Sequence, residues 1–216
     1  NKQGRNAGAG NVQVGSGVAD ACSRWNIISL NDYEWTLRTD CFRPSDSSNK
    51  YFYKIKSKVN ASYYIKPGTN YVGTSNTVDD DMIWYFEEAS YDDYMTYYYI
   101  RLANDGQYLR YRSTAVGQDN AIELASHTGS ETGDAEDRFQ FIVVRGAVSN
   151  EEWNTTDISY NIVPKLLKRT DDNINFHCVS SNQGLGKPLK TRNDRASTDN
   201  KWTFEILSEN GIEIDA

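Results

Sequence analysis

The sequence predicts an all-β protein built from three repeated units of four strands. A short motif of alternating aromatic and apolar residues recurs about every 60 residues, at Trp25, Trp84, Phe139 and Trp202. Segments rich in tyrosine and β-branched residues precede the last three motifs and partly alternate, as strands do. No stretch shows a convincing helical periodicity, so we expect little or no helix. Each unit is too small to bury its aromatic residue alone, so the units must share one core.

The four strands of a unit can be followed in order along the chain. The first strands are expected at 50–56, 96–102 and 159–163, and the second at 63–66, 108–111 and 175–178. A third strand is visible at 120–124 and 188–191, and the aromatic motif forms the fourth. Turn residues fill the links, and 104–107 (Asn-Asp-Gly-Gln) joins two strands like a hairpin.

Three four-stranded units that end in an aromatic motif resemble the β-trefoil, and within it the ricin-type lectin-like family, over residues 50–207. The resemblance implies six strands in a short barrel, six more capping it as hairpins, and a repeated Gln-x-Trp motif in the shared core. We therefore expect Trp84, Phe139 and Trp202 to be buried. The motif is degenerate in this chain, because other residues stand where the family has Gln: Ser23, Met82, Asp137 and Asn200.

The first of the four motifs lies outside the three complete units. Residues 1–30 look like the second half of a unit, so we expect them to be the tail of an upstream trefoil-like repeat. Residues 31–49 are predicted to be a linker and 50–216 the β-trefoil domain. The chain starts at Asn1 rather than Met, which favours a piece of a longer polypeptide with upstream domains.

Charge and hydropathy argue against two classes of partner. The net charge of −7 disfavours nucleic acid, because phosphate binding needs clustered Lys and Arg. No apolar run approaches the roughly 20 residues of a membrane span, so we expect no membrane insertion. The 15 Tyr and 5 Trp among many polar residues suggest a secreted or cell-surface protein.

Cysteine and histidine spacing indicates neither a metal nor a cofactor. The three cysteines are scattered; Cys22 and Cys41 either pair or stay free, and Cys178 reads as a buried thiol. The acidic runs 79–81, 87–88, 92–93 and 151–152 are adjacent residues, which read as solvated turns rather than as a catalytic pair. His127 and His177 show no arrangement of nucleophile and base. We expect no enzyme activity.

Aromatic and polar side chains near the hairpins suggest glycan binding, because sugars stack on rings while Asp, Asn or Gln takes their hydroxyls. The candidate ligand-binding residues of the middle unit are Asp105, Gln107, Tyr108, Tyr111 and Asn120. Those of the first unit are Tyr63, Asn70 and Tyr71, and those of the last are Asp172, Asn173, Asn175 and Asn182. The alternative for each unit is that the polar residues only form turns and the tyrosines pack in the core.

The sequence thus predicts a non-catalytic carbohydrate-binding module of a secreted glycan-handling protein. The alternative is a protein-interaction or structural β-trefoil that binds no sugar.

Overall fold

The computed structural model describes residues 42–69, 71–92, 95–112, 121–145, 159–167, 177–181, 184–194, 196–209 and 212–213. The predicted partial repeat 1–30, with Trp25, lies outside these residues, and so do Cys22 and Cys41. So do six candidate ligand-binding residues, namely Asn70, Asn120, Asp172, Asn173, Asn175 and Asn182.

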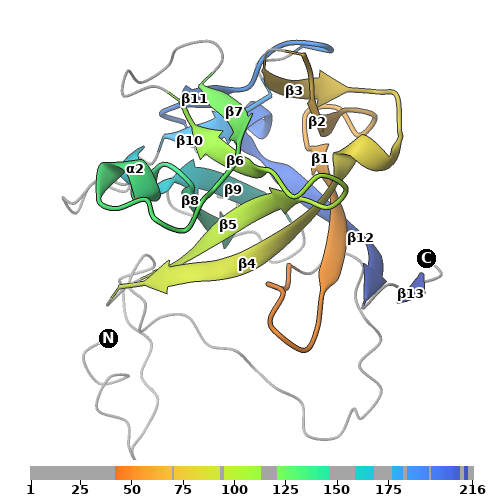
Figure 1. Ribbon diagram of the computed structural model, residues 1–216. Coiled ribbons are helices and arrows are strands. Elements are labelled where there is room, and N and C mark those ends of the chain that lie inside the picture. Colours follow the sequence, from red (N-terminus) through yellow and green to blue (C-terminus); the bar gives the residue numbers. More distant parts are fainter. Residues whose placement is uncertain are drawn as a thin grey trace, which may run out of the picture. The chain divides into compact units, whose positions relative to one another are not determined.

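A closed antiparallel barrel forms the body of the described structure (Figure 1). Its strands follow one another in the order β1, β4, β5, β8, β9 and β12, and β12 pairs back onto β1 along its length. The closure leaves these strands without an open edge. The bounds are Tyr51–Ser57 for β1, Ile83–Tyr91 for β4, Thr96–Leu102 for β5, Gln140–Arg145 for β8, Tyr160–Pro164 for β9 and Trp202–Glu209 for β12.

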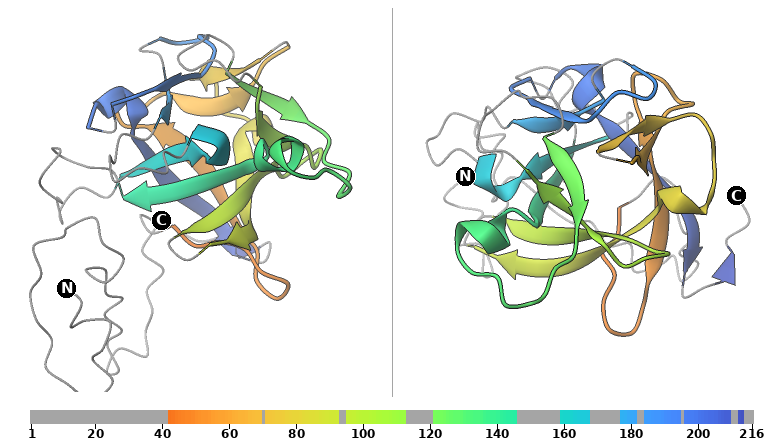
Figure 2. Two further views of the ribbon diagram at one scale, coloured as in Figure 1. Left: turned by 90° about the vertical axis from the view of Figure 1, so that its left-hand side faces the viewer. Right: turned by 45° about the horizontal axis from the view of Figure 1, so that its top comes forward.

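Three hairpins gather at one end of the barrel, as both views in Figure 2 show. Along the chain, each hairpin follows the first barrel strand of its unit and precedes the second, so the described residues form three successive four-stranded units. This arrangement is the β-trefoil that the repeat layout predicted. The hairpins pair β2 (Tyr64–Pro67) with β3 (Val72–Ser75), β6 (Tyr108–Tyr111) with β7 (Ile122–Ala125), and β10 (Cys178–Ser180) with β11 (Lys190–Arg192).

Backbone hydrogen bonds join the hairpins of different units. The Leu189 N–H donates to the Val72 carbonyl at 2.9 Å, and the Ala121 N–H donates to the Leu189 carbonyl at 3.2 Å. Gly73 lies so close to residue 187 that a Cβ atom there would be 2.6 Å from the Lys187 carbonyl oxygen. The contact between the first and third hairpins therefore depends on a residue without a side chain.

Helix in the described residues is confined to single turns, in agreement with the sequence. These turns are α2 (Asp134–Asp137), η2 (Asp80–Met82), η3 (Lys165–Leu167) and η4 (Thr198–Asn200). A last short strand, β13 (Ile212–Glu213), pairs with β12. No helix in the described part of the chain is long and apolar enough to cross a membrane.

The three motif aromatics lie in the core, as predicted. Trp84 and Trp202 are fully buried and Phe139 is 2% exposed. The indole N–H of Trp84 donates to the Ile65 carbonyl at 3.1 Å, and that of Trp202 donates to the Val179 carbonyl at 3.0 Å. Each bond connects the fourth strand of a unit with its second strand. Phe139 has no donor, so the middle unit makes no equivalent bond.

Residues 42–49, which the sequence assigned to the linker, contact the barrel directly. The ring of Phe42 lies 4.8 Å from that of Phe86 and 5.4 Å from that of Phe204, measured between centroids. The Ser45 N–H donates to the Phe86 carbonyl at 2.6 Å. The described trefoil therefore includes this segment, because its aromatic ring packs among core rings from the first and third units.

Candidate functional site

The middle unit carries most of the candidate site residues that the structure describes. Its turn between β5 and β6 is a hairpin turn, as the sequence predicted, with Gly106 at a φ of 73°. One carboxylate oxygen of Asp105 accepts the Gln107 N–H at 2.8 Å. The Arg101 Nε–H donates to the Gly106 carbonyl at 3.0 Å. Asp105 is exposed and Gln107 is half-buried.

Tyr108 follows this turn and is half-buried among other rings. The Arg101 guanidinium lies over its ring, 5.1 Å from the centroid. The rings of Tyr99 and His127 lie 5.7 Å and 5.3 Å away. Burial raises the pKa of the Tyr108 phenol, and the nearby Arg101 charge partly opposes this effect. The phenol therefore stays a neutral hydrogen-bond donor at physiological pH.

The other predicted residues do not join this group. Tyr111 is fully buried in the core, so it offers no ring face to a ligand. Tyr63 lies in the turn between β1 and β2, where its N–H donates to the Asn60 carbonyl at 2.9 Å. Tyr71 lies in the turn between β2 and β3, and its hydroxyl donates to the Gly186 carbonyl at 2.8 Å. The two tyrosines therefore lie in different turns of the first unit and remain its described candidates. Asp105, Gln107 and Tyr108 remain the described candidates of the middle unit.

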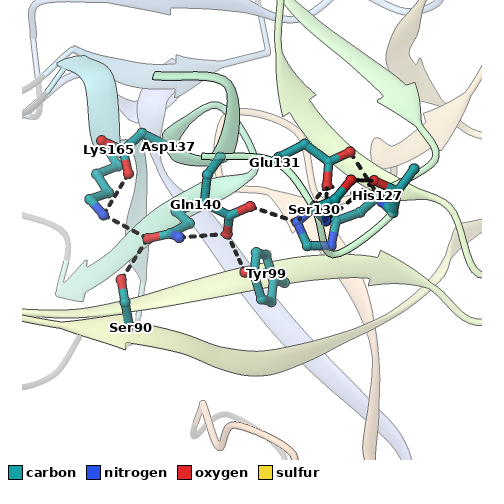
Figure 3. A network of polar contacts seen from close by, with 10 residues as sticks. Ser90, Tyr99, His127, Ser130, Glu131, Asp137, Gln140 and Lys165 are labelled. Carbon is teal, nitrogen blue, oxygen red and sulfur yellow. Dashed lines mark hydrogen bonds and ion pairs between the residues drawn. The ribbon is translucent and has the colours of Figure 1, made fainter. Parts of the chain in front are cut away.

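Figure 3 shows a polar network that the sequence did not reveal. One of its members, His127, has its ring 5.3 Å from that of Tyr108. His127 follows β7, and its Nε2 atom lies 2.7 Å from a Glu136 carboxylate oxygen on α2. The same nitrogen lies 3.6 Å from a carboxylate oxygen of Glu131, in the loop between β7 and α2. The other Glu136 oxygen accepts hydrogen bonds from the Tyr99 hydroxyl and from Gln140 Nε2, the latter at 2.8 Å.

Gln140 extends this network to the first and third units. Its side-chain oxygen accepts from the Ser90 hydroxyl at 2.6 Å and from Lys165 Nζ at 2.8 Å. Lys165 also pairs with Asp137 at 2.7 Å. Ser90 belongs to β4 and Lys165 to η3, so one buried amide connects all three units. In Figure 3, Tyr99 lies between Gln140 and His127.

Hydrogen bonding keeps both glutamates of the network ionised. The Thr128 N–H lowers the pKa of Glu131 to about 2. Burial raises the pKa of Glu136, but hydrogen bonds from His127, Tyr99 and Gln140 outweigh burial and lower it overall. Burial and the bond to Glu136 raise the pKa of the Tyr99 phenol, which is consistent with Tyr99 as the donor.

The ligand atoms of His127, Glu131 and Glu136 all lie within 4.8 Å of one another. An imidazole and two carboxylates are donors that divalent metal ions accept. The sequence did not predict this group, because it contains no pair of cysteines or histidines at metal-ligand spacing. The one signal available was a histidine followed by two glutamates within a single loop and helical turn.

Comparison with known proteins places the chain by its fold. No family model matches the sequence. No curated protein matches it either. Among solved structures, it is similar to ThreeFoil, a designed three-fold symmetric protein, with a TM-score of 0.50 and 13% identity over 71% of this chain and 97% of that one.

Two further structures show the same likeness. The BEL β-trefoil, in an apo crystal form, gives a TM-score of 0.52 and 15% identity over 76% of this chain and 96% of that one. PSL1a, in a complex with E64, gives 0.50 and 18% over 77% of this chain and 49% of that one. The chain thus has the β-trefoil fold, which is the fold of the lectin-like family that its repeats resemble.

Proposed function

We propose that this chain is a non-catalytic carbohydrate-binding β-trefoil module of a secreted or cell-surface protein. The observation that carries the proposal is the β5–β6 turn of the middle unit. There the Arg101 guanidinium lies 5.1 Å from the centroid of the half-buried Tyr108 ring. In the same turn, the exposed Asp105 carboxylate accepts the Gln107 backbone N–H. Carboxylate, amide and guanidinium groups bind paired sugar hydroxyls, and a tyrosine adds ring contact and a hydroxyl.

The roles of the acidic residues support a binding module rather than a glycosidase. Asp79 accepts the Asp81 N–H at 3.2 Å at the start of η2 and also pairs with Lys66. Glu87 lies 3.8 Å from an Arg101 nitrogen. Glycoside hydrolysis needs two carboxyl groups held across a cleft in different environments. These acids instead cap a turn and form ion pairs.

A glycan array with the full chain tests the proposed function, followed by titration of any retained sugar at millimolar concentration. A millimolar site corresponds to only about −4 kcal/mol, so high ligand concentrations are needed. We expect at least one class of glycan to be retained. Absence of binding at these concentrations would contradict the proposal and favour the protein-interaction or structural alternative.

Variants of Asp105 and Gln107 then test whether the middle-unit turn is the site at which the glycan binds. Asp105→Asn and Gln107→Ala should each weaken glycan binding about tenfold, which corresponds to the loss of roughly one net hydrogen bond of about 1.4 kcal/mol. Asp134→Asn is the matched control, because it removes an exposed carboxylate of the same unit on α2. Glycan binding that is unchanged in both site variants would leave the lectin function standing and exclude the middle-unit turn as its site.

A further inference from the structure

We propose that His127, Glu131 and Glu136 form a binding site for a zinc-class divalent metal ion on the middle unit. The three residues belong to the segment between β7 and the end of α2, so one short stretch of chain supplies every ligand. The proposal is independent of glycan binding, although His127 also packs against Tyr108.

The distances between the ligand atoms fit a small ion. Zinc bound by nitrogen and oxygen at 2.0 to 2.1 Å in a tetrahedron holds its ligands about 3.3 Å apart. His127 Nε2 lies 2.7 Å from its nearest Glu136 oxygen and 3.6 Å from that of Glu131. One distance is shorter than the ideal and the other is longer. The ligand atoms of the two glutamates lie within 4.8 Å of each other, so the carboxylates must move toward each other to surround a common centre.

Surrounding hydrogen bonds already orient both carboxylates. The Tyr99 hydroxyl and Gln140 hold one Glu136 oxygen, which leaves the other directed at the imidazole. The N–H groups of Thr128 and Ser130 donate to Glu131 at 3.1 Å each. Partners of this kind fix the ligands of metal sites and typically change metal affinity 10- to 100-fold when they are removed.

The donor types of the three residues indicate which divalent ion suits the site. A nitrogen donor with two oxygen donors suits zinc better than calcium or magnesium, which prefer oxygen ligands alone. Three protein ligands leave a fourth position for water or another small ligand.

Zinc binding to the full chain tests the proposal. The chain is stripped with a chelator and titrated with Zn²⁺ against a chromophoric competitor, and Co²⁺ absorption reports the coordination number. We expect one Zn²⁺ bound by this site and a four-coordinate Co²⁺ spectrum. Millimolar Mg²⁺ or Ca²⁺ should not displace the zinc ion. A chain that takes up no Zn²⁺ would overturn the proposal.

Ligand and partner variants assign the binding to these residues. Glu131→Gln should lower zinc affinity roughly 100-fold, and Tyr99→Phe should lower it about tenfold. His127→Gln also removes a ring that packs against Tyr99 and Phe139, so the loop variant Glu131→Gln is the decisive one.

The matched control is Glu123→Gln, because Glu123 is a half-buried glutamate on β7 that pairs with Arg110. Its zinc affinity should equal that of the unmodified chain. Equal zinc affinity in the unmodified chain and in Glu131→Gln would overturn the proposal, since the metal would then bind elsewhere.

Discussion

Trp84 donates its indole N–H to the backbone carbonyl of Ile65 at 3.1 Å, and Trp202 makes the same bond to Val179 in the third unit. Both carbonyls belong to the second strand of their own unit, so each tryptophan ties the cap hairpin to the barrel. The middle unit lacks this bond because Phe139 replaces the tryptophan. The ring of Phe139 instead packs against His127, at 4.8 Å between centroids. The middle unit, which has no indole bond, is thus also the unit that contains the polar network around His127.

Replacing Trp202 should reveal how much the indole bond contributes. Trp202→Phe keeps a ring but leaves the buried Val179 carbonyl without its donor, which should cost about 1 to 3 kcal/mol. Trp202→Ala should cost about 3 to 5 kcal/mol, because it also opens a cavity. Urea unfolding followed by fluorescence measures both. Tyr91→Ala is the control, since Tyr91 is 79% exposed and should change little. Equal unfolding midpoints for Trp202→Phe and the unmodified chain would contradict this role.

Gly73→Ala should loosen the contact between the first and third hairpins. The new Cβ would lie 2.6 Å from the Lys187 carbonyl oxygen and 2.8 Å from a ring carbon of Tyr71, so the backbone must shift. Overpacking of this kind costs about 1 to 3 kcal/mol. Hydrogen exchange should show faster exchange at the Leu189 N–H, which bonds to Val72. Ser75→Ala in the same strand serves as control. Unchanged exchange at Leu189 in Gly73→Ala would contradict the close approach.

The repeat pattern predicted the barrel, the hairpins and the burial of Trp84, Phe139 and Trp202, because an aromatic residue recurring once per unit reports a core that all units share. It did not predict that Phe42 packs among the rings of the barrel. The segment from 42 to 49 has no counterpart in the other units, so periodicity carries no information about it. Tyr111 was a candidate ligand residue, yet it is buried. Its strand alternates, and sequence alone does not decide which face of a four-residue strand points inward.

The sequence did not predict the group of His127, Glu131 and Glu136 for a different reason. Its residues lie in a loop and a single helical turn, where neither a period of two nor one of 3.6 indicates which side chains converge. The supporting bonds from Tyr99 and Gln140 come from other strands, and only the folded barrel brings them to Glu136.

Alkaline unfolding should depend on Tyr85. Burial, and next the nearby Glu87, raises the pKa of this phenol from 10.0 to about 12. The neutral phenol thus contributes constant stability below pH 10. The free energy of unfolding should fall as the pH rises from 10 toward 12, because the unfolded chain ionises there first. Tyr85→Phe removes this titration, so the variant should lose less stability between pH 10 and pH 12. Urea unfolding midpoints at pH 9, 10 and 11 measure the difference, and parallel pH profiles for the two proteins would contradict the prediction.

Acid should weaken the loop that carries Glu131. The Thr128 N–H and its neighbours lower the pKa of this carboxyl group from 4.5 to about 2, so its contribution to stability is complete above pH 4.5 and is lost as the pH falls through about 2. Glu136 acts in the same direction, because its pKa is also lowered.

The amide of Glu131→Gln can still accept both backbone N–H bonds but carries no charge. The difference in melting temperature between Glu131→Gln and the unmodified chain should therefore be largest near pH 5 and shrink toward pH 2. The melts are run with a chelator present, so that bound metal does not add to the difference. If this difference in melting temperature stays the same from pH 5 to pH 2, the charge of Glu131 does not stabilise the loop, and the prediction is wrong.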